Sequence, residues 1–325
     1  MSAPVCLIVN PSAGGGKSRR LAPVAHEALV ALGLEVRRVE TRDLGHARQL
    51  AVEAAQAGET VVSLSGDGLV GEIADVLREV PGSVLGILPG GRGNDLARVL
   101  GIPDDVRAAC SVIAAGHVRE IDLGIVTKAG SEAAPRAFVG IASAGFDSVA
   151  NRIANEAPPW LGGLVYAYGA LRALISWQPA RFEIELKPSG ERHSFSGYSI
   201  AAANSRAYGG GMVAAPDAML DDGLLEIVAI ERVSRLRFLA NLPRVFKGTH
   251  VELPTVRVFR AAKVEISSEH PFQMYADGDP IGELPVRVSA QRGAVRMLVP
   301  ANGSDALSPL SGADTALSGV DPAGA

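Results

Sequence analysis

Residues 5–18 read VCLIVNPSAGGGKS. The five apolar residues Val5–Val9 form an unbroken run, which is typical of a strand covered on both faces. The glycines that follow stand just before a helix-forming stretch, where backbone N–H groups and the helix dipole favour an anion. The segment therefore predicts a parallel α/β sheet whose first strand ends in a phosphate-binding loop; the alternative is a glycine-rich turn without a ligand.

The same alternation continues outward to about residue 120. Further apolar runs predict strands at Leu34–Glu40, Thr60–Leu64 and Val84–Leu88. Helix-forming segments separate them, at Ser18–Leu32, at His46–Ala57, from Leu69 onward, at Asn94–Leu100 and at Asp104–Ala115. Strands separated by helices of this length imply βαβ units with right-handed crossovers.

The character of the sequence changes after about Ile121. Short β-type segments appear there, separated by turns that contain Pro, Gly or Asp, and they predict a mostly antiparallel second domain, a sandwich or a barrel. The predicted strands are Arg136–Ala142, Arg181–Leu186, Ser196–Ala202, Leu224–Ile230, Thr255–Phe259, Lys263–Ile266, Val286–Ser289 and Val295–Val299. We expect a nucleotide-binding domain over residues 1–122, a β-rich domain over 123–300, and a disordered tail over 301–325, which contains no aromatic or basic residue.

Composition limits the function classes. The 325 residues suit two domains, and a net charge of −4 argues against nucleic acid as the main partner. The two cysteines are too few for a disulfide framework or a zinc site. The first residues show no secretory signal, so we expect a cytoplasmic protein.

Two familiar phosphate motifs are present only in part. Gly16-Lys17-Ser18 resembles the end of a Walker A motif, but Pro11 stands where its first glycine belongs. The turn Gly66-Asp67-Gly68-Leu69-Val70-Gly71 has dinucleotide-binding spacing, yet no acidic residue follows at the end of the next strand to hold a ribose. Asp67 would also repel a pyrophosphate unless a cation lay between them. A metal-assisted nucleotide phosphate site is the interpretation that remains.

A third glycine loop follows the strand Val84–Leu88. It reads Pro89-Gly90-Gly91-Arg92-Gly93-Asn94-Asp95, so three strand ends break into glycine loops with polar residues. The carboxyl ends of parallel strands meet at one edge of the sheet, which is where doubly wound folds bind ligands. Thr41, at the end of the second strand, is expected on the same rim.

Four motifs in this order carry a family resemblance. They are Asn10-Pro11-x-Ala13-Gly14, Ser65-Gly66-Asp67-Gly68, Pro89-x-Gly91-x-x-Asn94-Asp95 and Asp277-Gly278-Asp279. Together they resemble the diacylglycerol kinase catalytic-domain family, which includes bacterial soluble lipid kinases and is related to the sphingosine and ceramide kinases. The resemblance implies an α/β domain like that of phosphofructokinases and NAD kinases, a β-sandwich domain after it, and ATP in the cleft between them.

The resemblance also assigns residues to the nucleotide. Those implied to hold ATP are Asn10, Pro11, Ser12, Ala13, Gly14, Thr41, Gly66, Asp67, Gly68, Leu69, Val70, Gly71, Glu72, Arg92 and Asn94. Arg92 stands where bacterial members usually have threonine, and an arginine there is suited to phosphate oxygens. Leu69 likewise departs from the bacterial pattern and resembles the sphingosine kinase version of the turn.

Two aspartates are candidates for the catalytic base. Asp277-Gly278 in a β-rich context is first of all a hairpin turn. By resemblance, Asp279 occupies the position of the family's proton acceptor, which is usually the longer glutamate. In sphingosine kinases the aspartate that matches Asp67 is thought to be the base instead.

A metal site is implied in the second domain. By resemblance, the side chain of Asp222 and the backbone carbonyls of Met219 and Leu224 hold a structural Mg²⁺. The alternative is that Asp221-Asp222-Gly223 is only a turn between two strands. The predicted cofactors are accordingly ATP and Mg²⁺.

Two segments are candidates for lipid contact. Trp160–Trp177 has apolar residues at helical spacing, including Leu161, Leu164, Tyr168, Leu171 and Ile175. It forms ordinary core, the wall of an acyl pocket or a membrane span, and the span is disfavoured by Arg172 and three glycines. Ser234–Lys247 predicts a basic amphipathic helix, which can lie on anionic lipid or be a solvated charged face.

The sequence therefore predicts a cytoplasmic, peripherally membrane-associated lipid kinase. We expect it to phosphorylate diacylglycerol to phosphatidic acid, with a homodimer as a candidate assembly. The alternatives are a sphingoid-base or ceramide-type lipid kinase, an NAD kinase-like small-molecule kinase, and a non-catalytic nucleotide sensor.

Overall fold

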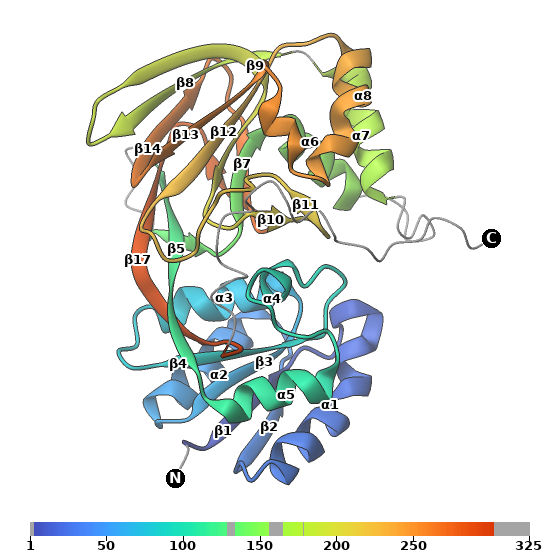
Figure 1. The fold of residues 1–325 in the computed structure, drawn as a ribbon, viewed down its shortest axis with the longest axis vertical. Coiled ribbons are helices and arrows are strands. Elements are labelled where there is room, and N and C mark those ends of the chain that lie inside the picture. The colour runs from blue at the N-terminus through green and yellow to red at the C-terminus, as the bar shows by residue number, and fades with distance from the viewer. Residues whose placement is uncertain (1–2, 129–133, 156–164, 178, 302–325) are drawn as a thin grey trace, which may run out of the picture.

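The computed structural model describes residues 3–128, 134–155, 165–177 and 179–301. They form two units, stacked one above the other in Figure 1. The predicted tail lies outside the described residues except for Ala301, as does the first part of the predicted Trp160–Trp177 segment.

The N-terminal unit is a parallel sheet between two pairs of helices, as predicted. Its strands lie in the order β4-β3-β1-β2, and β1 pairs in parallel with both β2 and β3. Every residue of β1 is buried, in keeping with its unbroken apolar sequence. Helices α2 and α3 pack against each other, as do α1 and α5. The elements are β1 Val5–Val9, α1 Ala13–Ala31, β2 Val36–Glu40, α2 Leu44–Gln56, β3 Thr60–Ser65, α3 Asp67–Leu77, β4 Val84–Pro89, α4 Asp95–Val99 and α5 Val106–Ala115.

The C-terminal unit is an antiparallel β-sandwich with helices at its side. Strand β9 is central, since it pairs antiparallel with β7, β8 and β12. The strands are β5 Val118–Lys128, β6 Arg136–Phe138, β7 Ile141–Gly145, β8 Ala180–Lys187, β9 Arg192–Ala203, β10 Ala207–Tyr208, β11 Met212–Val213, β12 Leu225–Glu231, β13 Val256–Ala261, β14 Lys263–Ser268, β15 Gln273–Ala276, β16 Asp279–Glu283 and β17 Val286–Leu298. The helices are α6 Phe146–Asn155, α7 Val165–Ser176, α8 Arg235–Val245 and the short 3₁₀ helix η2 Thr249–Glu252.

Three predicted strands have different bounds in the structure. The predicted strand Arg136–Ala142 is divided into β6 and β7, because Val139 and Gly140 turn their amides toward the Asp277 carboxylate. The two predicted strands near the C-terminus are one long strand, β17, with an irregularity between Gln291 and Val295. Strand β5 was not predicted, since its first residues, Val118 to Glu120, are exposed or only partly buried and carry two charges.

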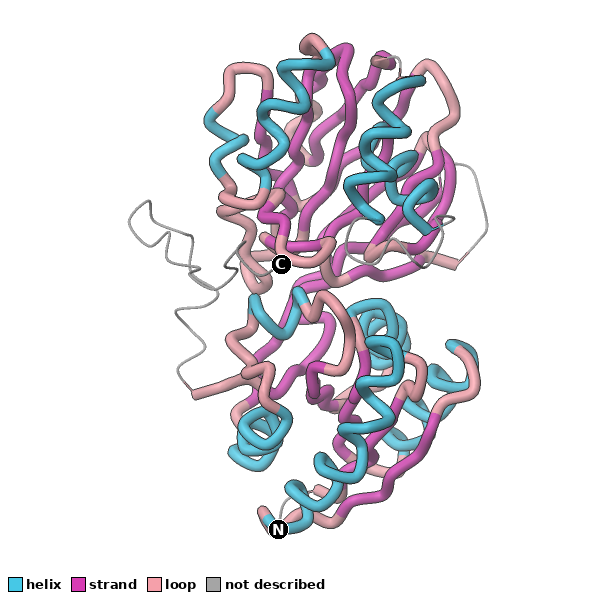
Figure 2. Tube along the Cα trace, turned by 90° about the vertical axis from the view of Figure 1, so that its right-hand side faces the viewer, coloured by secondary structure: helices cyan, strands magenta, loops and turns pink. Residues whose placement is uncertain are grey.

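Two long strands join the units. Strands β5 and β17 pair antiparallel along most of their length, and the end of β17 pairs in parallel with β4 through Arg296 and Met297. Both strands run from one unit to the other in Figure 1, and Figure 2 shows strand rather than loop at the crossing. The domain limit expected after residue 122 therefore falls inside β5.

Within the ranges that the structure describes, no helix has the length and apolar character needed to cross a bilayer.

Candidate functional site

The three glycine loops touch through their backbones. A Cβ atom on Gly14 would lie 2.5 Å from the carbonyl oxygen of Gly90, and one on Gly91 would lie 2.5 Å from the Cα of Gly66. No real Cβ tolerates such contacts, so the absence of side chains at these positions is what allows the loops to meet. The sequence prediction of a shared edge is therefore realised by direct contact between the loops.

Two asparagines shape these loops from within. The Oδ1 of Asn10 accepts a hydrogen bond from the Ser12 amide at 3.1 Å. Asn94 adopts a left-handed conformation, with φ of 52°, and its Oδ1 accepts from the Gly91 amide at 2.8 Å. Ser18, in the first turns of α1, donates its hydroxyl to the Gly90 carbonyl at 3.2 Å. Both asparagine side chains thus have a role in loop conformation beside any role toward a ligand.

Asp67 lies at the start of α3, among the loops. Its Oδ1 accepts from the Leu96 amide at 3.1 Å, and its Oδ2 faces Gly93 together with the carboxylate of Asp95. Burial raises the pKa of Asp67, and the neighbouring charge of Asp95 acts in the same direction, while the Leu96 amide opposes it. Asp95 in turn accepts from the Gly210 amide at 2.7 Å, which ties this corner to the C-terminal unit.

Asp277 fixes the hairpin that reaches α3 from the other unit. Asp277 and Gly278 form the turn between β15 and β16, and Asp277 has a left-handed φ of 50°. Its carboxylate accepts from the amides of Val139 at 2.7 Å, Gly140 at 2.9 Å and Ile141 at 3.2 Å. Burial raises the pKa of Asp277 to about 6, although these three amides act against the shift. Sequence reasoning gave Asp277 only the role of a turn residue and missed that it anchors the hairpin to β7.

The hairpin and the start of α3 line one small cavity. Gly68, Gly71 and Glu72 come from the N-terminal unit, and Asp277 and Asp279 come from the C-terminal unit. A Cβ on Gly71 would lie 3.3 Å from the Asp277 carboxylate, so the two backbones are in close approach. Asp279 is exposed at this cavity, and desolvation and then the Glu72 charge raise its pKa, whereas Arg136 lowers it. Motifs some 200 positions apart are therefore brought together.

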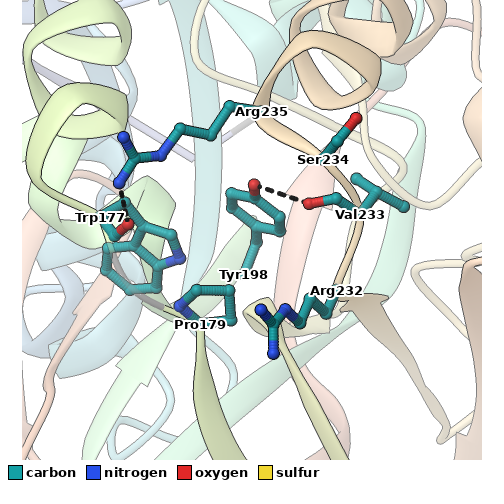
Figure 3. Close-up of a pocket in the computed structure, with 7 residues that line it drawn as sticks. All are labelled: Trp177, Pro179, Tyr198, Arg232, Val233, Ser234 and Arg235. Atoms are coloured by element: carbon teal, nitrogen blue, oxygen red, sulfur yellow. Dashed lines mark hydrogen bonds between the residues drawn. The ribbon is translucent and has the colours of Figure 1, made fainter.

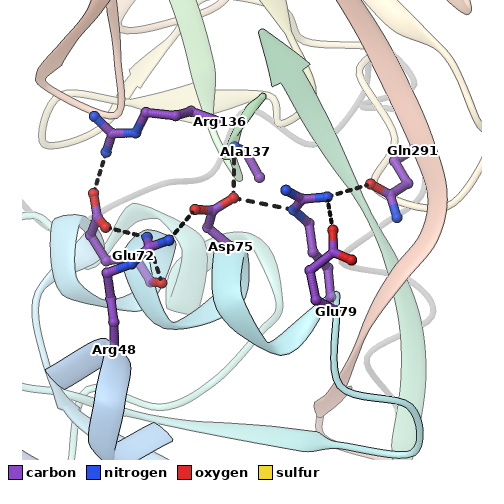
Figure 4. Close-up of polar contacts among 8 residues, drawn as sticks. Arg48, Glu72, Asp75, Glu79, Arg136, Ala137 and Gln291 are labelled. Atoms are coloured by element: carbon purple, nitrogen blue, oxygen red, sulfur yellow. Dashed lines mark hydrogen bonds and ion pairs between the residues drawn. The ribbon is translucent and has the colours of Figure 1, made fainter. Parts of the chain in front are cut away.

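An ion-pair network holds α3 against β6, and Figure 4 shows its members. Glu72 pairs with Arg48 at 2.5 Å and with Arg136. Asp75 pairs with Arg48 at 2.8 Å and accepts from the Ala137 amide at 2.9 Å. Paired, partly buried arginines of this kind restrain the elements that carry them. Glu72, predicted to hold the nucleotide, is therefore occupied as a bridge between the two units.

The remaining residues predicted to bind the nucleotide are either exposed on the glycine loops or buried behind them. Thr41 is buried at the end of β2, where its amide donates to the Val9 carbonyl at 2.9 Å. Arg92 is exposed on its loop. The side chains of Leu69 and Val70 pack into the hydrophobic core, so only their backbone groups face the loops. The others, Pro11, Ser12, Ala13, Gly66 and Gly68, belong to the three loops.

The residues predicted to hold a structural metal show a different arrangement. The Oδ1 of Asp222 accepts from the Leu224 amide at 2.9 Å, and its Oδ2 pairs with the guanidinium of Arg260. Arg260 and the Leu224 amide therefore engage the Asp222 carboxylate, and the structural Mg²⁺ at this turn stays a prediction. No cluster of three or more His, Cys, Asp or Glu side chains able to hold a metal occurs in the described ranges.

Arg260 also lies against Glu226, and this pair predicts how the stability of the fold depends on pH. Arg260 Nε is 2.8 Å from Glu226 Oε1, but that oxygen has no well-directed hydrogen bond to any described residue. Burial raises the pKa of Glu226 from 4.5 to about 7, against the effect of Arg260. The folded protein therefore holds a proton that the unfolded chain releases, and stability is lost as the pH rises from 4.5 through 7.

We expect Glu226→Gln to become more stable relative to the parent as the pH rises from 5 to 8. The relative gain is on the order of 3 kcal/mol at most, because each pKa unit corresponds to about 1.4 kcal/mol. Urea unfolding at several pH values measures it. Glu265→Gln is the matched control: pairing with Arg287 lowers the pKa of Glu265, so this carboxylate changes protonation only below about pH 4.5, and its variant should show almost no trend between pH 5 and 8. A pH-independent difference for Glu226→Gln would contradict the assignment.

Known proteins match both units. Residues 4–126 match the diacylglycerol kinase catalytic domain, and residues 140–299 match the YegS C-terminal NAD kinase beta sandwich-like domain. A diacylglycerol kinase of Mycobacterium tuberculosis is 34% identical over 304 residues, covering 92% of this chain and 96% of that protein. A YegS-like lipid kinase of Chromohalobacter salexigens is 32% identical, covering 81% of this chain and 83% of that protein.

A solved structure shows the same fold. The crystal structure of a diacylglycerol kinase from Bacillus anthracis superposes with a TM-score of 0.71 at 21% identity, covering 92% of this chain and 97% of that one. The motif-based resemblance is thus confirmed by whole-chain sequence similarity. The chain belongs to the diacylglycerol kinase catalytic-domain family and is a lipid kinase, a transferase.

Proposed function

We propose that the protein transfers the γ-phosphate of MgATP to the free hydroxyl of diacylglycerol, forming phosphatidic acid and ADP. One observation carries the proposal: the hairpin that bears Asp279 meets the start of α3 beside the glycine loops. A carboxylate from one unit therefore shares a cavity with Gly68 and Gly71 of the second glycine loop. The curated relative from Mycobacterium tuberculosis, with its 34% identity, supports diacylglycerol as the acceptor.

The glycine loops are suited to the triphosphate. Gly14, Gly15 and Gly16 all have positive φ, at 58°, 64° and 88°, directly before the regular turns of α1. Successive left-handed residues at a helix start present backbone N–H groups to one side, as anion-binding loops do. Cβ atoms on Gly15 and Gly16 would meet nothing within 4 Å, so this side of the loop has room for a ligand.

Asp279 is the carboxylate best placed to act as the base. Its side chain is exposed at the cavity, whereas Asp67 is committed to the Leu96 amide. In the proposed reaction the lipid hydroxyl oxygen bonds to the γ-phosphorus, its proton passes to Asp279, and the bond from phosphorus to the bridging oxygen of ADP breaks. Such transfers need positioning and charge stabilisation more than covalent help from the protein.

The metal belongs to the substrate in this proposal. Mg²⁺ arrives as MgATP and neutralises charge on the phosphates. Asp67 is the loop carboxylate suited to it, because oxygen ligands are the ones that Mg²⁺ prefers. No step is assigned to a metal at Asp222, where Arg260 is bound.

Helix α8 is the surface that we propose to lie on the membrane. None of its residues is buried, and Leu236 is 82% exposed. Arg235, Arg237 and Arg244 accompany the apolar residues, and basic amphipathic helices with this pattern bind anionic lipid surfaces. The end of the predicted Trp160–Trp177 segment has the character of ordinary core instead. Ala173, Leu174 and Trp177 pack in an aromatic core with Phe146 and Tyr198.

Parallel assays with labelled ATP test the acceptor. The purified protein is incubated with diacylglycerol, a sphingoid base, ceramide and NAD in separate reactions, and the products are identified. We expect label in phosphatidic acid alone. Label in another acceptor would show that the protein is a kinase with a different substrate. Nucleotide binding without any labelled product would favour a nucleotide sensor.

A further inference from the structure

A second cavity lies in the C-terminal unit, between the end of α7, strand β9 and the start of α8. Its volume is about 610 Å³, and it shares no residue with the cavity at Asp279. Figure 3 shows the side chains around it. They are Trp177, Pro179, Tyr198, Arg232, Val233, Ser234 and Arg235.

One wall of this cavity is aromatic and contains an unpaired donor. The rings of Trp177 and Tyr198 are stacked at 6.4 Å, and the Tyr198 hydroxyl donates to the Val233 carbonyl at 3.1 Å. Trp177 is only 6% exposed, yet its indole Nε1 has no hydrogen-bond partner in the described part of the chain. In Figure 3 this nitrogen is turned toward the space between the indole and Tyr198. A buried donor left unpaired destabilises the fold, and an acceptor oxygen on a ligand would satisfy it.

Two cationic side chains also line the cavity. They are Arg232 and Arg235, and no acidic residue is among the lining side chains that the structure describes. Ser234 caps α8 by accepting from the Arg237 amide at 3.3 Å, so the positive end of an eleven-residue helix is directed to the same place. Arg235 also donates to the Trp177 carbonyl at 2.9 Å, which holds its guanidinium beside the indole, as Figure 3 shows. Arginine is the side chain most suited to phosphate oxygens.

The size of the cavity excludes a lone anion as its full occupant. A volume of 610 Å³ corresponds to roughly 20 water molecules of liquid, far more than one phosphate occupies. The edges of Trp177 and Tyr198 that reach the cavity give it an apolar side, although both side chains are largely buried. Exposed Leu236 and Leu239 on α8 continue this apolar character beyond the cavity.

We propose that this cavity binds an anionic amphiphile through its phosphate group, with the phosphate at Arg232 and Arg235, an oxygen at the Trp177 indole, and the apolar part against Trp177 and Tyr198. It is a second lipid site, separate from the place of phosphoryl transfer. The inference does not rest on the proposed reaction, because it uses only the residues of this cavity.

Trp177 fluorescence provides a direct test. The chain has two tryptophans, so Trp160→Phe leaves Trp177 as the only indole reporter. This single-tryptophan protein is titrated with dihexanoyl phosphatidic acid, with dihexanoylglycerol and with inorganic phosphate. We expect a saturable change in emission with the phosphatidic acid, and at least tenfold weaker affinity for the other two. Equal affinity for inorganic phosphate, or for the uncharged lipid, would overturn the assignment.

Charge variants in the same background locate the site. We expect Arg232→Gln to weaken binding of dihexanoyl phosphatidic acid at least tenfold, while Arg107→Gln, an exposed arginine on α5 of the other unit, changes it less than twofold. Binding of MgATP by calorimetry should be the same in all variants and verifies that each is folded. Unchanged lipid affinity in Arg232→Gln, with Trp177 still responding, would contradict the proposal.

Discussion

Asp279→Asn is expected to lower turnover about 10²–10⁴-fold with MgATP affinity changed less than twofold. That range is what a positioned general base typically contributes. The substitution keeps the shape of the side chain and removes only its ability to accept a proton. Nucleotide affinity is retained because the glycine loops are contributed by the other unit. Steady-state kinetics with diacylglycerol, together with calorimetric titration of MgATP, measures both quantities.

The pH dependence separates a base from a merely structural carboxylate. Desolvation and Glu72 raise the pKa of Asp279, so the active, deprotonated form is lost at a higher pH than an ordinary aspartate would require. Parent turnover therefore rises with pH through this pKa, and the Asn variant lacks that rise. Asp279→Glu is the matched control, since it keeps the carboxylate and should retain most activity. Full activity in Asp279→Asn would transfer the role of base to Asp67.

Gly14→Ala is expected to abolish measurable nucleotide binding and to destabilise the N-terminal unit. The new methyl group would lie 2.5 Å from the carbonyl oxygen of Gly90, a backbone atom that can move only with its whole loop. Overpacking of this kind costs about 1–3 kcal/mol. The positive φ of 58° adds about 1–2 kcal/mol for a residue with a Cβ. Thermal unfolding and MgATP calorimetry check the two effects.

Gly15→Ala isolates the contact from the backbone conformation. Its φ of 64° carries the same conformational penalty, but its Cβ would meet no atom within 4 Å. We therefore expect Gly15→Ala to be destabilised by the conformational term alone and Gly14→Ala by both. Equal stability of the two variants would show that the approach of the first and third loops does not govern this site.

The parallel sheet and its loops could be predicted from sequence because their causes are local. An unbroken apolar run such as Val5–Val9 specifies a strand covered on both faces, and the glycines that follow specify the turn. Strand β5 escaped prediction because its start is charged and its partner, β17, is some 170 positions away. The break between β6 and β7 likewise depends on the distant Asp277 carboxylate.

The candidate site also has parts that follow from local sequence and parts that depend on distant residues. The loop glycines and Asp67 follow from motifs that can be identified in a few residues. The bridging role of Glu72 could not be predicted, because Arg48 and Arg136 reach it from separate elements. The pairing of Asp222 with Arg260 depends on the register of β12 with β13, which no local pattern near Asp222 specifies.

The pairing of β17 with β4 has a consequence for folding during synthesis. The last stretch of that strand completes the outer edge of the first sheet, so residues near 297 finish a structure that begins at Val5. During synthesis the nucleotide-binding half therefore emerges with one strand edge unprotected until residues near 297 have left the ribosome. A single cut of the chain cannot yield two self-sufficient halves, and a fragment that stops at residue 122 would keep this edge open to aggregation.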